Sequence, residues 1–255
     1  MSSIRLYEYQ DVQSVVICGD IHGDFNALIH KVCVRYQMTD TLIIVAGDCG
    51  FGFERLGYYE NVFQRNSSRL SKANNYLVFV RGNHDDPSYF TEEKISHSRF
   101  RTIPDYSVIQ ACGHNMLCVG GAVSIDRSSR IEYDSKQRKS CLATYWPNEL
   151  PVYDEEAINK IGKEYNIDTV ITHTAPFFCE LTLKNGLVDW YERDSHLKDD
   201  CEKERLVMDK LFSRLKSNAH PLSHWFYGHF HQSGTAEIDG VRFSMLDIME
   251  LKELL

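Results

Sequence analysis

The sequence contains no hydrophobic run that approaches the length of a membrane span. A transmembrane helix needs about 20 consecutive apolar residues, and no stretch of the 255-residue chain comes close to that. Residues 1–11 are too polar for a signal peptide. The eight cysteines show no CxxC spacing, so most are expected to pack as small hydrophobic side chains. These absences predict a protein of the cytoplasm that has no membrane partner.

The chain also lacks an excess of positive charge. Lys and Arg number 28 against 36 Asp and Glu, so the formal net charge is -8 at pH 7. Proteins that bind duplex nucleic acid usually present a broad basic face, and duplex nucleic acid is therefore not an expected partner. Nucleotides are not excluded, because bound divalent cations would make a site locally positive and attract an anionic substrate.

Hydrophobic patterning predicts an α/β chain. With 43% hydrophobic residues, a chain of this length can bury a full core. Apolar β-branched runs alternate with stretches of helical spacing, and such βαβ units gather ligands at the carboxyl ends of parallel strands. Strands are expected at residues 14–18, 41–46, 76–80, 116–119, 169–172 and 222–227, and helices at 26–36, 59–70, 154–165 and 199–217.

Two further segments lack this alternation. Residues 235–246 are expected to form a hairpin that turns at Asp239-Gly240. Residues 124–151 are polar and aperiodic, which predicts a long loop or lid. Because the chain has no obvious linker or internal repeat, we expect one domain over residues 1–255, with the 124–151 segment as a lid-like insertion.

Side chains of the kinds that bind metals stand at the ends of the predicted strands. They occur in five short words: GDIHG at 19–23, GD at 47–48, GNHD at 82–85, TH at 172–173 and GHFH at 228–231. Each word alone is also typical of a turn, but their joint occurrence at strand ends favours a site for two metal ions. The candidate ligands are Asp20, His22, Asp48, Asn83, His173, His229 and His231.

The mixture of carboxylate, amide and imidazole groups narrows the choice of metal. Mg²⁺ prefers oxygen ligands nearly alone, so we expect two ions of Mn²⁺ or Fe, with Zn²⁺ as an alternative. Two such ions ~3.5 to 4 Å apart can ionise a bridging water and hold both oxygens of an in-line displacement at phosphorus. Asp48 is expected to bridge them, and the nearby cations to lower the pKa of the Cys49 thiol.

Three residues around Asn83 are candidates for catalysis. His84 cannot easily reach the same ion as its neighbour, so we expect it to act as general acid toward the leaving group. Asp85 is expected to orient His84, and the planar guanidinium of Arg81 is expected to contact phosphate oxygens. The alternatives are a solvent-exposed His84 that is hydrogen-bonded to Asp85, and a strand-end Arg81 in solvent.

The order GDIHG, GD, GNHD, H and GHFH, which spans Gly19 to His231, resembles that of the calcineurin-like metallophosphoesterases. The resemblance implies two mixed β-sheets packed as a sandwich and flanked by helices, with a dinuclear site between loops. It implies that His84 protonates the leaving group. The stretches GGAVSIDRSSR, YWPNELP and THTAP look like those of a bacterial or phage-type branch. The implied ligands are Asp20, His22, Asp48 and His231 for the first ion, and Asp48, Asn83, His173 and His229 for the second.

The word RGNH at 81–84 is also similar to that of the protein serine/threonine phosphatases, but the preceding word departs from theirs. Those enzymes have the pattern GDxxDRG, whereas Phe51 and Gly52 stand at its second Asp and its Arg here. This departure weighs against phosphoprotein specificity. It leaves Arg55, Arg127 and Arg130 as candidates for the missing positive charge.

We therefore expect a metal-dependent hydrolase of phosphate monoesters, in which a metal-bridging hydroxide attacks in line and His84 is the general acid. The substrate is expected to be a phosphorylated small molecule, a nucleotide or a phosphoprotein. The alternative is a phosphodiesterase or nucleotidase that acts on cyclic nucleotides, dinucleoside polyphosphates or nucleic-acid ends. A non-catalytic scaffold is a third hypothesis, which the complete set of ligands and His84 disfavours.

Four aromatic side chains follow the GD word at 47–48. They are expected either to stack a ring or to pack in the core: Phe51, Phe53, Tyr58 and Tyr59.

Overall fold

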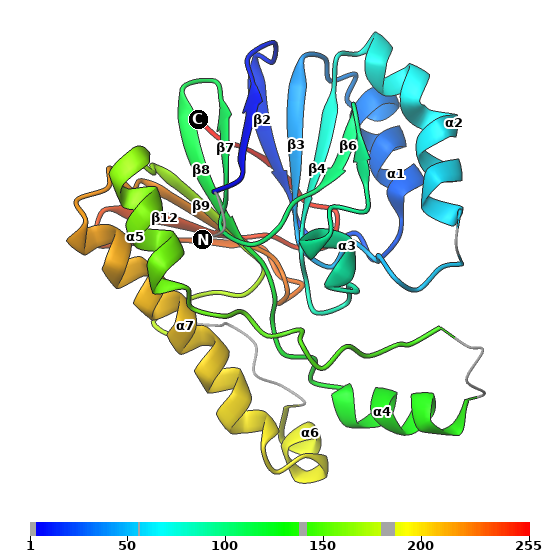
Figure 1. Ribbon diagram of the computed structural model, residues 1–255, viewed down its shortest axis with the longest axis vertical. Coiled ribbons are helices and arrows are strands. Elements are labelled where there is room, and N and C mark those ends of the chain that lie inside the picture. Colours follow the sequence, from blue (N-terminus) through cyan, green and yellow to red (C-terminus); the bar gives the residue numbers. More distant parts are fainter. Residues whose placement is uncertain (1–3, 56, 138–141, 180–186) are drawn as a thin grey trace.

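Two β-sheets face each other at the centre of the molecule, and helices cover their outer faces (Figure 1). The computed structural model describes residues 4–55, 57–137, 142–179 and 187–255. Within this part of the chain both sheets combine parallel and antiparallel strands. The predicted α/β class and the sandwich of two mixed sheets are thereby confirmed.

The six-stranded sheet carries the first three predicted strands side by side. Its order is β13 (Leu251–Glu253), β2 (Ser14–Cys18), β3 (Thr41–Ala46), β4 (Tyr76–Val80), β6 (Phe100–Thr102) and β5 (Ser96–His97). Strands β2, β3, β4 and β6 are parallel, so the chain leaves each of them at the same edge of the sheet. The loops that follow β2, β3 and β4 therefore lie next to one another.

The seven-stranded sheet carries the remaining predicted strands. Its order is β1 (Leu6–Tyr9), β7 (Ser107–Ala111), β8 (His114–Val119), β9 (Thr169–Thr172), β10 (His224–Tyr227), β12 (Val241–Met245) and β11 (Gly234–Ile238). Strands β8, β9 and β10 are parallel. The predicted hairpin is confirmed as β11 and β12, and its turn residues Asp239 and Gly240 have φ of 51° and 73°, as a two-residue hairpin turn requires.

Three hydrophobic clusters hold the layers together. One lies between the sheets and includes Ile17, Ile44 and Val78, while their neighbours in sequence point to the opposite face, as alternation along a strand requires. The second cluster packs α1 and α2 on the six-stranded sheet, and the third packs α5 and α7 on the seven-stranded sheet (Figure 1). The helices are α1 (Phe25–His30) with its π-helical continuation η1 (Lys31–Arg35), α2 (Tyr58–Lys72), α3 (Ser88–Thr91), α4 (Arg127–Lys136), α5 (Glu155–Glu164), α6 (Leu187–Arg193) and α7 (Leu197–Ser217).

Helix α4 corrects the prediction of a long loop at 124–151. The helix has no buried residue, so it lacks the apolar periodicity by which a helix is recognised in a sequence. Ion pairs at i,i+4 spacing stabilise it instead, between Arg130 and Asp126 and between Lys136 and Glu132. In Figure 1, α4 and α6 lie at the lower end of the molecule. The single-domain organisation and the lid role stay predictions.

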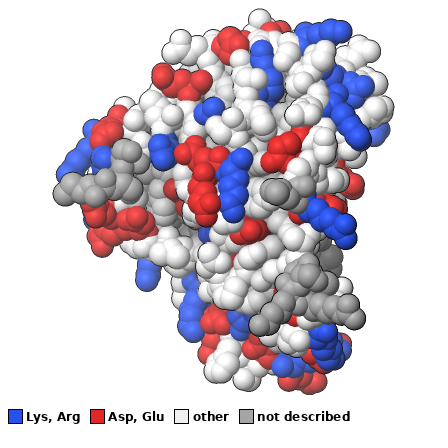
Figure 2. Space-filling model, turned by 45° about the vertical axis from the view of Figure 1, so that its right-hand side comes forward, with Lys and Arg blue, Asp and Glu red and all other residues white. Residues whose placement is uncertain are grey.

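No helix in the described ranges is long and apolar enough to cross a membrane. Figure 2 shows Lys and Arg side chains interspersed with Asp and Glu side chains over one face of the molecule. The described residues of this face form no continuous basic tract, in keeping with the net charge of -8.

Candidate metal centre

The candidate ligands meet where the parallel strands of both sheets end. Asp20, Asp48 and Asn83 follow β2, β3 and β4 of the six-stranded sheet. His173 and His229 follow β9 and β10 of the seven-stranded sheet. Because the carboxyl ends of these strands point to the same end of the sandwich, residues more than 200 positions apart in sequence come into contact.

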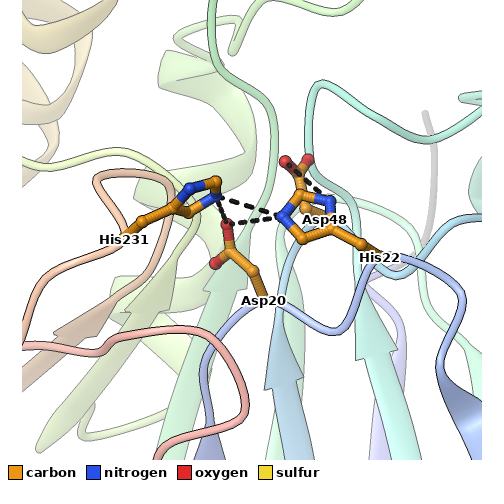
Figure 3. A group of neighbouring side chains, drawn as sticks. All are labelled: Asp20, His22, Asp48 and His231. Carbon is orange, nitrogen blue, oxygen red and sulfur yellow. Dashed lines mark hydrogen bonds and ion pairs between the residues drawn. The ribbon is translucent and has the colours of Figure 1, made fainter.

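The first cluster, which we call the Asp20 group, consists of Asp20, His22, Asp48 and His231. One ligand atom from each lies within 4.8 Å of all the others, and Figure 3 shows the side chains turned toward one another. Nε2 of His231 is 3.1 Å from Nε2 of His22 and 3.1 Å from Oδ2 of Asp20. That carboxylate oxygen is buried and receives no hydrogen bond of good geometry from the described residues. A buried carboxylate oxygen of this kind, facing two imidazole nitrogens, fits a divalent cation.

The second cluster, which we call the His173 group, consists of Asp48, Asn83, His173 and His229. Nε2 of His173 is 3.0 Å from Oδ1 of Asn83 and 3.1 Å from Oδ1 of Asp48. The other ring nitrogen, Nδ1, is 2.8 Å from the carbonyl oxygen of Ala46. A proton on Nδ1 donates to this carbonyl and leaves Nε2 as a lone-pair ligand. The His229 ring packs against that of His173 at a centroid distance of 5.0 Å, and Asp48 belongs to both groups.

Four of these residues have a backbone conformation that side chains other than glycine rarely adopt. His22, Asp48, His229 and His231 have φ of 46°, 46°, 69° and 48°. Such strain costs roughly 1 kcal/mol or more per residue and persists where surrounding structure enforces it, most often at functional sites. The glycines beside them make room: a Cβ on Gly47 would lie 2.2 Å from Nδ1 of His173.

Charges within the two groups oppose the effect of burial on the pKa of Asp48 and of His173, and add to it at His229. Burial alone would raise the pKa of Asp48, but the imidazoles of His173, His84 and His229 hold that pKa well below its usual range. Burial would lower the pKa of His173, and the carboxylates of Asp48 and Asp20 raise it instead. Burial and the neighbouring His173 lower the pKa of His229. The Asp48 carboxylate is thus ionised and attracts a proton onto His173, which is the attraction that a metal cation would satisfy in its place.

His84 lies beside the Asp20 group and is bonded to the Asp48 carboxylate through its backbone. Its amide donates to Oδ1 of Asp48 at 2.8 Å, and its ring centroid is 5.5 Å from that of His22. Nη2 of Arg130, on α4, lies 2.8 Å from Nε2 and 3.0 Å from Nδ1 of His84. Of the three arginines considered for the missing positive charge, the structure places this one at the site. Nε of Arg130 also pairs with Asp126, and its Nη1 donates to the carbonyl of Thr144. Arg127 is ion-paired with Asp194 and Asp200.

The structure corrects the role predicted for Asp85. Its buried carboxylate accepts hydrogen bonds of 2.7 to 3.0 Å from four backbone amides, those of Cys49, Gly50, Phe51 and Gly82. Asp85 therefore fixes the loop after β3 and does not orient the His84 ring. The thiol of Cys49 is buried and donates to the carbonyl of Val80, and burial together with Asp85 raises its pKa well above the usual range. The effect of bound cations on this pKa stays a prediction.

The structure also corrects the role predicted for Arg81. The side chain is buried, and its guanidinium pairs with Asp105 at 2.8 Å. It also donates to the backbone carbonyls of Asn148, Glu149, Leu150 and Gly120. These partners engage the planar fork that phosphate would need, so Arg81 anchors the end of the 124–151 segment.

A pocket of about 370 Å³ opens beside His22 and His84. Phe53 and Tyr58 line it, and Phe53 meets Trp146 of the 124–151 segment edge to face at 5.1 Å. The two other aromatic residues of this region, Phe51 and Tyr59, are buried in the core. The acidic side chains in the lining are Asp24 and Glu54.

Sequence reasoning missed two buried carboxyl groups that border the site. Glu149 accepts hydrogen bonds from the amide and hydroxyl of Ser124. Glu204, on α7, accepts from the amide of Val123 and the hydroxyl of Thr174. Glu149 stands in the word YWPNELP, but that word does not point to its partner Ser124, and Glu204 stands in none of the quoted words.

This chain is similar to two solved structures at low sequence identity. A search of curated protein sequences found no match. Among solved structures, phosphopantetheinyl hydrolase of Mycobacterium tuberculosis is similar with 13% identity and a TM-score of 0.39, over 95% of this chain and 96% of that one. A candidate 5′-nucleotidase of Staphylococcus aureus, solved with alpha-ketoglutarate, is similar with 10% identity and a TM-score of 0.43, over 94% of this chain and 50% of that one.

The family model described as calcineurin-like phosphoesterase matches residues 14–233, which include every candidate ligand. The match covers far more than half of the chain, and the Asp20 group supplies a candidate metal site of the kind that these hydrolases need. The protein therefore belongs to the calcineurin-like phosphoesterase family of metal-dependent hydrolases.

Proposed function

We propose that the protein hydrolyses phosphate monoesters at two metal ions, one held by the Asp20 group and one by the His173 group. When bound, such ions supply Lewis acidity and an activated water nucleophile. The observation that carries the proposal is the position of His84. It lies next to the shared carboxylate of Asp48, beside the guanidinium of Arg130 and at the wall of a pocket.

His84 is suited to donate a proton to the leaving group. Its imidazole belongs to neither ligand group, and it lines the pocket in which the departing alcohol would lie. Burial lowers the pKa of His84, the Asp48 carboxylate opposes this shift, and the Arg130 guanidinium adds to it. The lower pKa reduces the protonated fraction of the ring and makes the protonated ring a stronger acid. A general acid held near a developing alkoxide contributes roughly 100-fold or more to the rate.

Arg130 favours a monoester over a diester. A phosphate monoester carries up to two negative charges on the phosphoryl group, and a diester carries one. The Arg130 guanidinium is half-buried beside His84, where a charge-assisted hydrogen bond to a phosphoryl oxygen is stronger than in open solvent. Arg130 thus supplies the positive charge of the arginine in the GDxxDRG pattern, whose position is occupied here by Gly52.

The pocket supports a leaving group that carries no further phosphate. Phe53 and Tyr58 offer aromatic surface to a ring. The carboxylates of Asp24 and Glu54 would repel a second phosphate, as a dinucleoside polyphosphate would place there. Aryl monophosphates and nucleoside monophosphates both fit this description.

Mn²⁺ or Fe, with Zn²⁺ as the alternative, suits the candidate ligands. A cytoplasmic location stays a prediction.

The test compares p-nitrophenyl phosphate with bis(p-nitrophenyl) phosphate on Mn²⁺-loaded protein. We expect kcat/KM to favour the monoester by about tenfold or more, because one added charge-assisted contact contributes at least about 1.4 kcal/mol. His84→Asn is expected to reduce turnover about 100-fold or more with unchanged Mn²⁺ content. His30→Asn, on the exposed face of α1, is the control.

Three results would contradict the proposal. Preference for the diester would favour a phosphodiesterase or nucleotidase. Unchanged turnover in His84→Asn would remove that residue from catalysis. A protein that binds two Mn²⁺ ions and hydrolyses neither ester would favour a non-catalytic scaffold.

A further inference from the structure

A chain of buried hydrogen bonds leads from Asn83 to the far end of the 124–151 segment. Nδ2 of Asn83 donates to Oγ of Ser124 at 3.0 Å. The Ser124 hydroxyl in turn donates to Oε2 of Glu149 at 2.6 Å, and the Ser124 amide donates to Oε1 at 2.9 Å. All three residues are at most 3% exposed. These hydrogen bonds therefore lie inside the protein and are screened from water.

The carboxylate of Glu149 determines which atom donates and which accepts in each of these hydrogen bonds. Burial raises the pKa of Glu149 to about 7, so at pH 8 its carboxyl group is largely ionised. An ionised carboxylate can only accept hydrogen bonds, and both donors of Ser124 are then directed at Glu149. The Ser124 oxygen is then left with lone pairs, which can accept only from a donor on Asn83. A carboxamide that turns its nitrogen to Ser124 must turn its oxygen the other way, and Oδ1 of Asn83 indeed faces Nε2 of His173 at 3.0 Å.

We propose that Glu149, acting through Ser124, is a positioning residue that fixes the Asn83 carboxamide with its oxygen toward the metal position of the His173 group. The inference rests on the proposed function, in which Asn83 is a metal ligand. The orientation matters because an amide nitrogen has no lone pair to offer a metal ion, whereas the amide oxygen is a good ligand. Arg81 holds Glu149 in place, since it donates to the backbone carbonyl of Glu149 at 2.7 Å.

Glu149→Gln tests the polarity with almost no change in shape. The glutamine can accept from the Ser124 amide only with its oxygen, so its NH2 group faces the Ser124 hydroxyl. That hydroxyl must then accept from position 149, and its own proton turns to Asn83. The Asn83 carboxamide then turns over, so that its nitrogen faces the metal position. We expect the affinity for one of two Mn²⁺ ions to fall about 10- to 100-fold, as for other residues that orient metal ligands.

A second substitution separates positioning from general damage. In Asn83→Asp with Glu149→Gln, the new carboxylate at position 83 presents an oxygen whichever way it turns and accepts the reversed Ser124 hydroxyl. This double variant is expected to bind the second Mn²⁺ ion more tightly than Glu149→Gln alone. The single variant Asn83→Asp sets its carboxylate against the Ser124 lone pairs and is expected to bind more weakly than the double variant. Glu132→Gln, on the exposed surface of α4, is the matched control.

Isothermal titration with Mn²⁺ measures stoichiometry and affinity without any need for turnover. Wild-type affinity for both ions in Glu149→Gln would overturn the inference, as would a double variant that binds no better than Glu149→Gln. A wild-type protein that binds fewer than two Mn²⁺ ions would overturn the proposed function itself, and this outcome is distinguishable because it needs no variant. Unfolding midpoints in chelator show whether each variant is folded.

Discussion

Glu204 allows a direct test of the electrostatics beneath the site. The carboxyl group is 3% exposed and joins the segments that carry Ser124 and His173, through the Val123 amide and the Thr174 hydroxyl. Burial raises the pKa of Glu204 from its ordinary value of 4.5 to about 8. At neutral pH the folded protein therefore holds a proton that the unfolded chain has released.

The sign and size of the effect follow from this difference. Because the folded-state pKa lies above the unfolded-state pKa, the stabilisation from Glu204 is complete below the ordinary pKa and is lost as the pH rises through the folded-state pKa. Within that window each pH unit lowers the free energy of unfolding by up to about 1.4 kcal/mol. Between pH 6 and pH 8 the loss is about 2 kcal/mol, since the slope levels off near the folded-state pKa.

Urea denaturation of the wild type and Glu204→Gln at pH 6 and pH 8, both in chelator, measures this loss. The glutamine keeps the shape and an acceptor oxygen but cannot ionise, so its stability lacks this contribution. Other titrating groups are common to both proteins and cancel in the difference. We expect the wild type to lose about 2 kcal/mol more than the variant, and Glu202→Gln, on the exposed face of α7, to behave as the wild type. Equal losses in wild type and Glu204→Gln would refute the reasoning.

Three further predictions concern the site itself. Arg130→Gln is expected to lower kcat/KM for a monoester about 10- to 100-fold, the effect of one charge-assisted hydrogen bond, as steady-state kinetics will measure. Gly228→Ala is expected to abolish binding of one Mn²⁺ ion in a titration, because the added Cβ would lie 2.1 Å from Oδ1 of Asp20. Asp85→Ala is expected to lower the free energy of unfolding by about 3 kcal/mol or more, measured in urea, because it leaves four backbone amides without an acceptor.

Matched variants separate these effects from general damage. Lys136→Gln removes the same charge from the exposed end of α4 and is expected to leave kcat/KM unchanged. Gly234→Ala adds a Cβ whose nearest neighbour, on Met245, is at an ordinary 3.4 Å, so both Mn²⁺ ions should bind. A monoesterase rate that is insensitive to Arg130→Gln would remove this arginine from phosphate binding.

The location of the candidate site could be predicted because each candidate ligand lies within a few residues of a buried strand. Strands such as β3, which is buried at all six positions, are evident from hydrophobicity alone, and the strand-end rule then brings Asp48 and its counterparts together. The roles of Asp85 and Arg81 could not be predicted in this way. Asp85 bonds to the amide of Cys49, 36 residues away, and Arg81 to the carbonyl of Glu149, 68 residues away.

The elements that the sequence did not reveal have little apolar pattern to detect. Helix α6 has no buried residue, and β13 is only three residues long. Even so, β13 matters to the site, because it pairs with β2 in the register Leu251 to Cys18. This pairing places the C-terminal strand beside the strand that carries Asp20, a long-range arrangement that no local signal encodes.

The 124–151 segment contacts the site at two points that differ in chemistry. Near its start, Ser124 bonds to the candidate ligand Asn83, and from α4 Arg130 meets the ring of His84. Asn83 and His84 are adjacent in sequence, so one segment acts on both the metal position and the proposed acid. The structure thus separates two classes of variant: changes at Ser124 should alter metal affinity first, and changes at Arg130 should alter turnover with both ions bound. A segment that served only as a cover would show no such division.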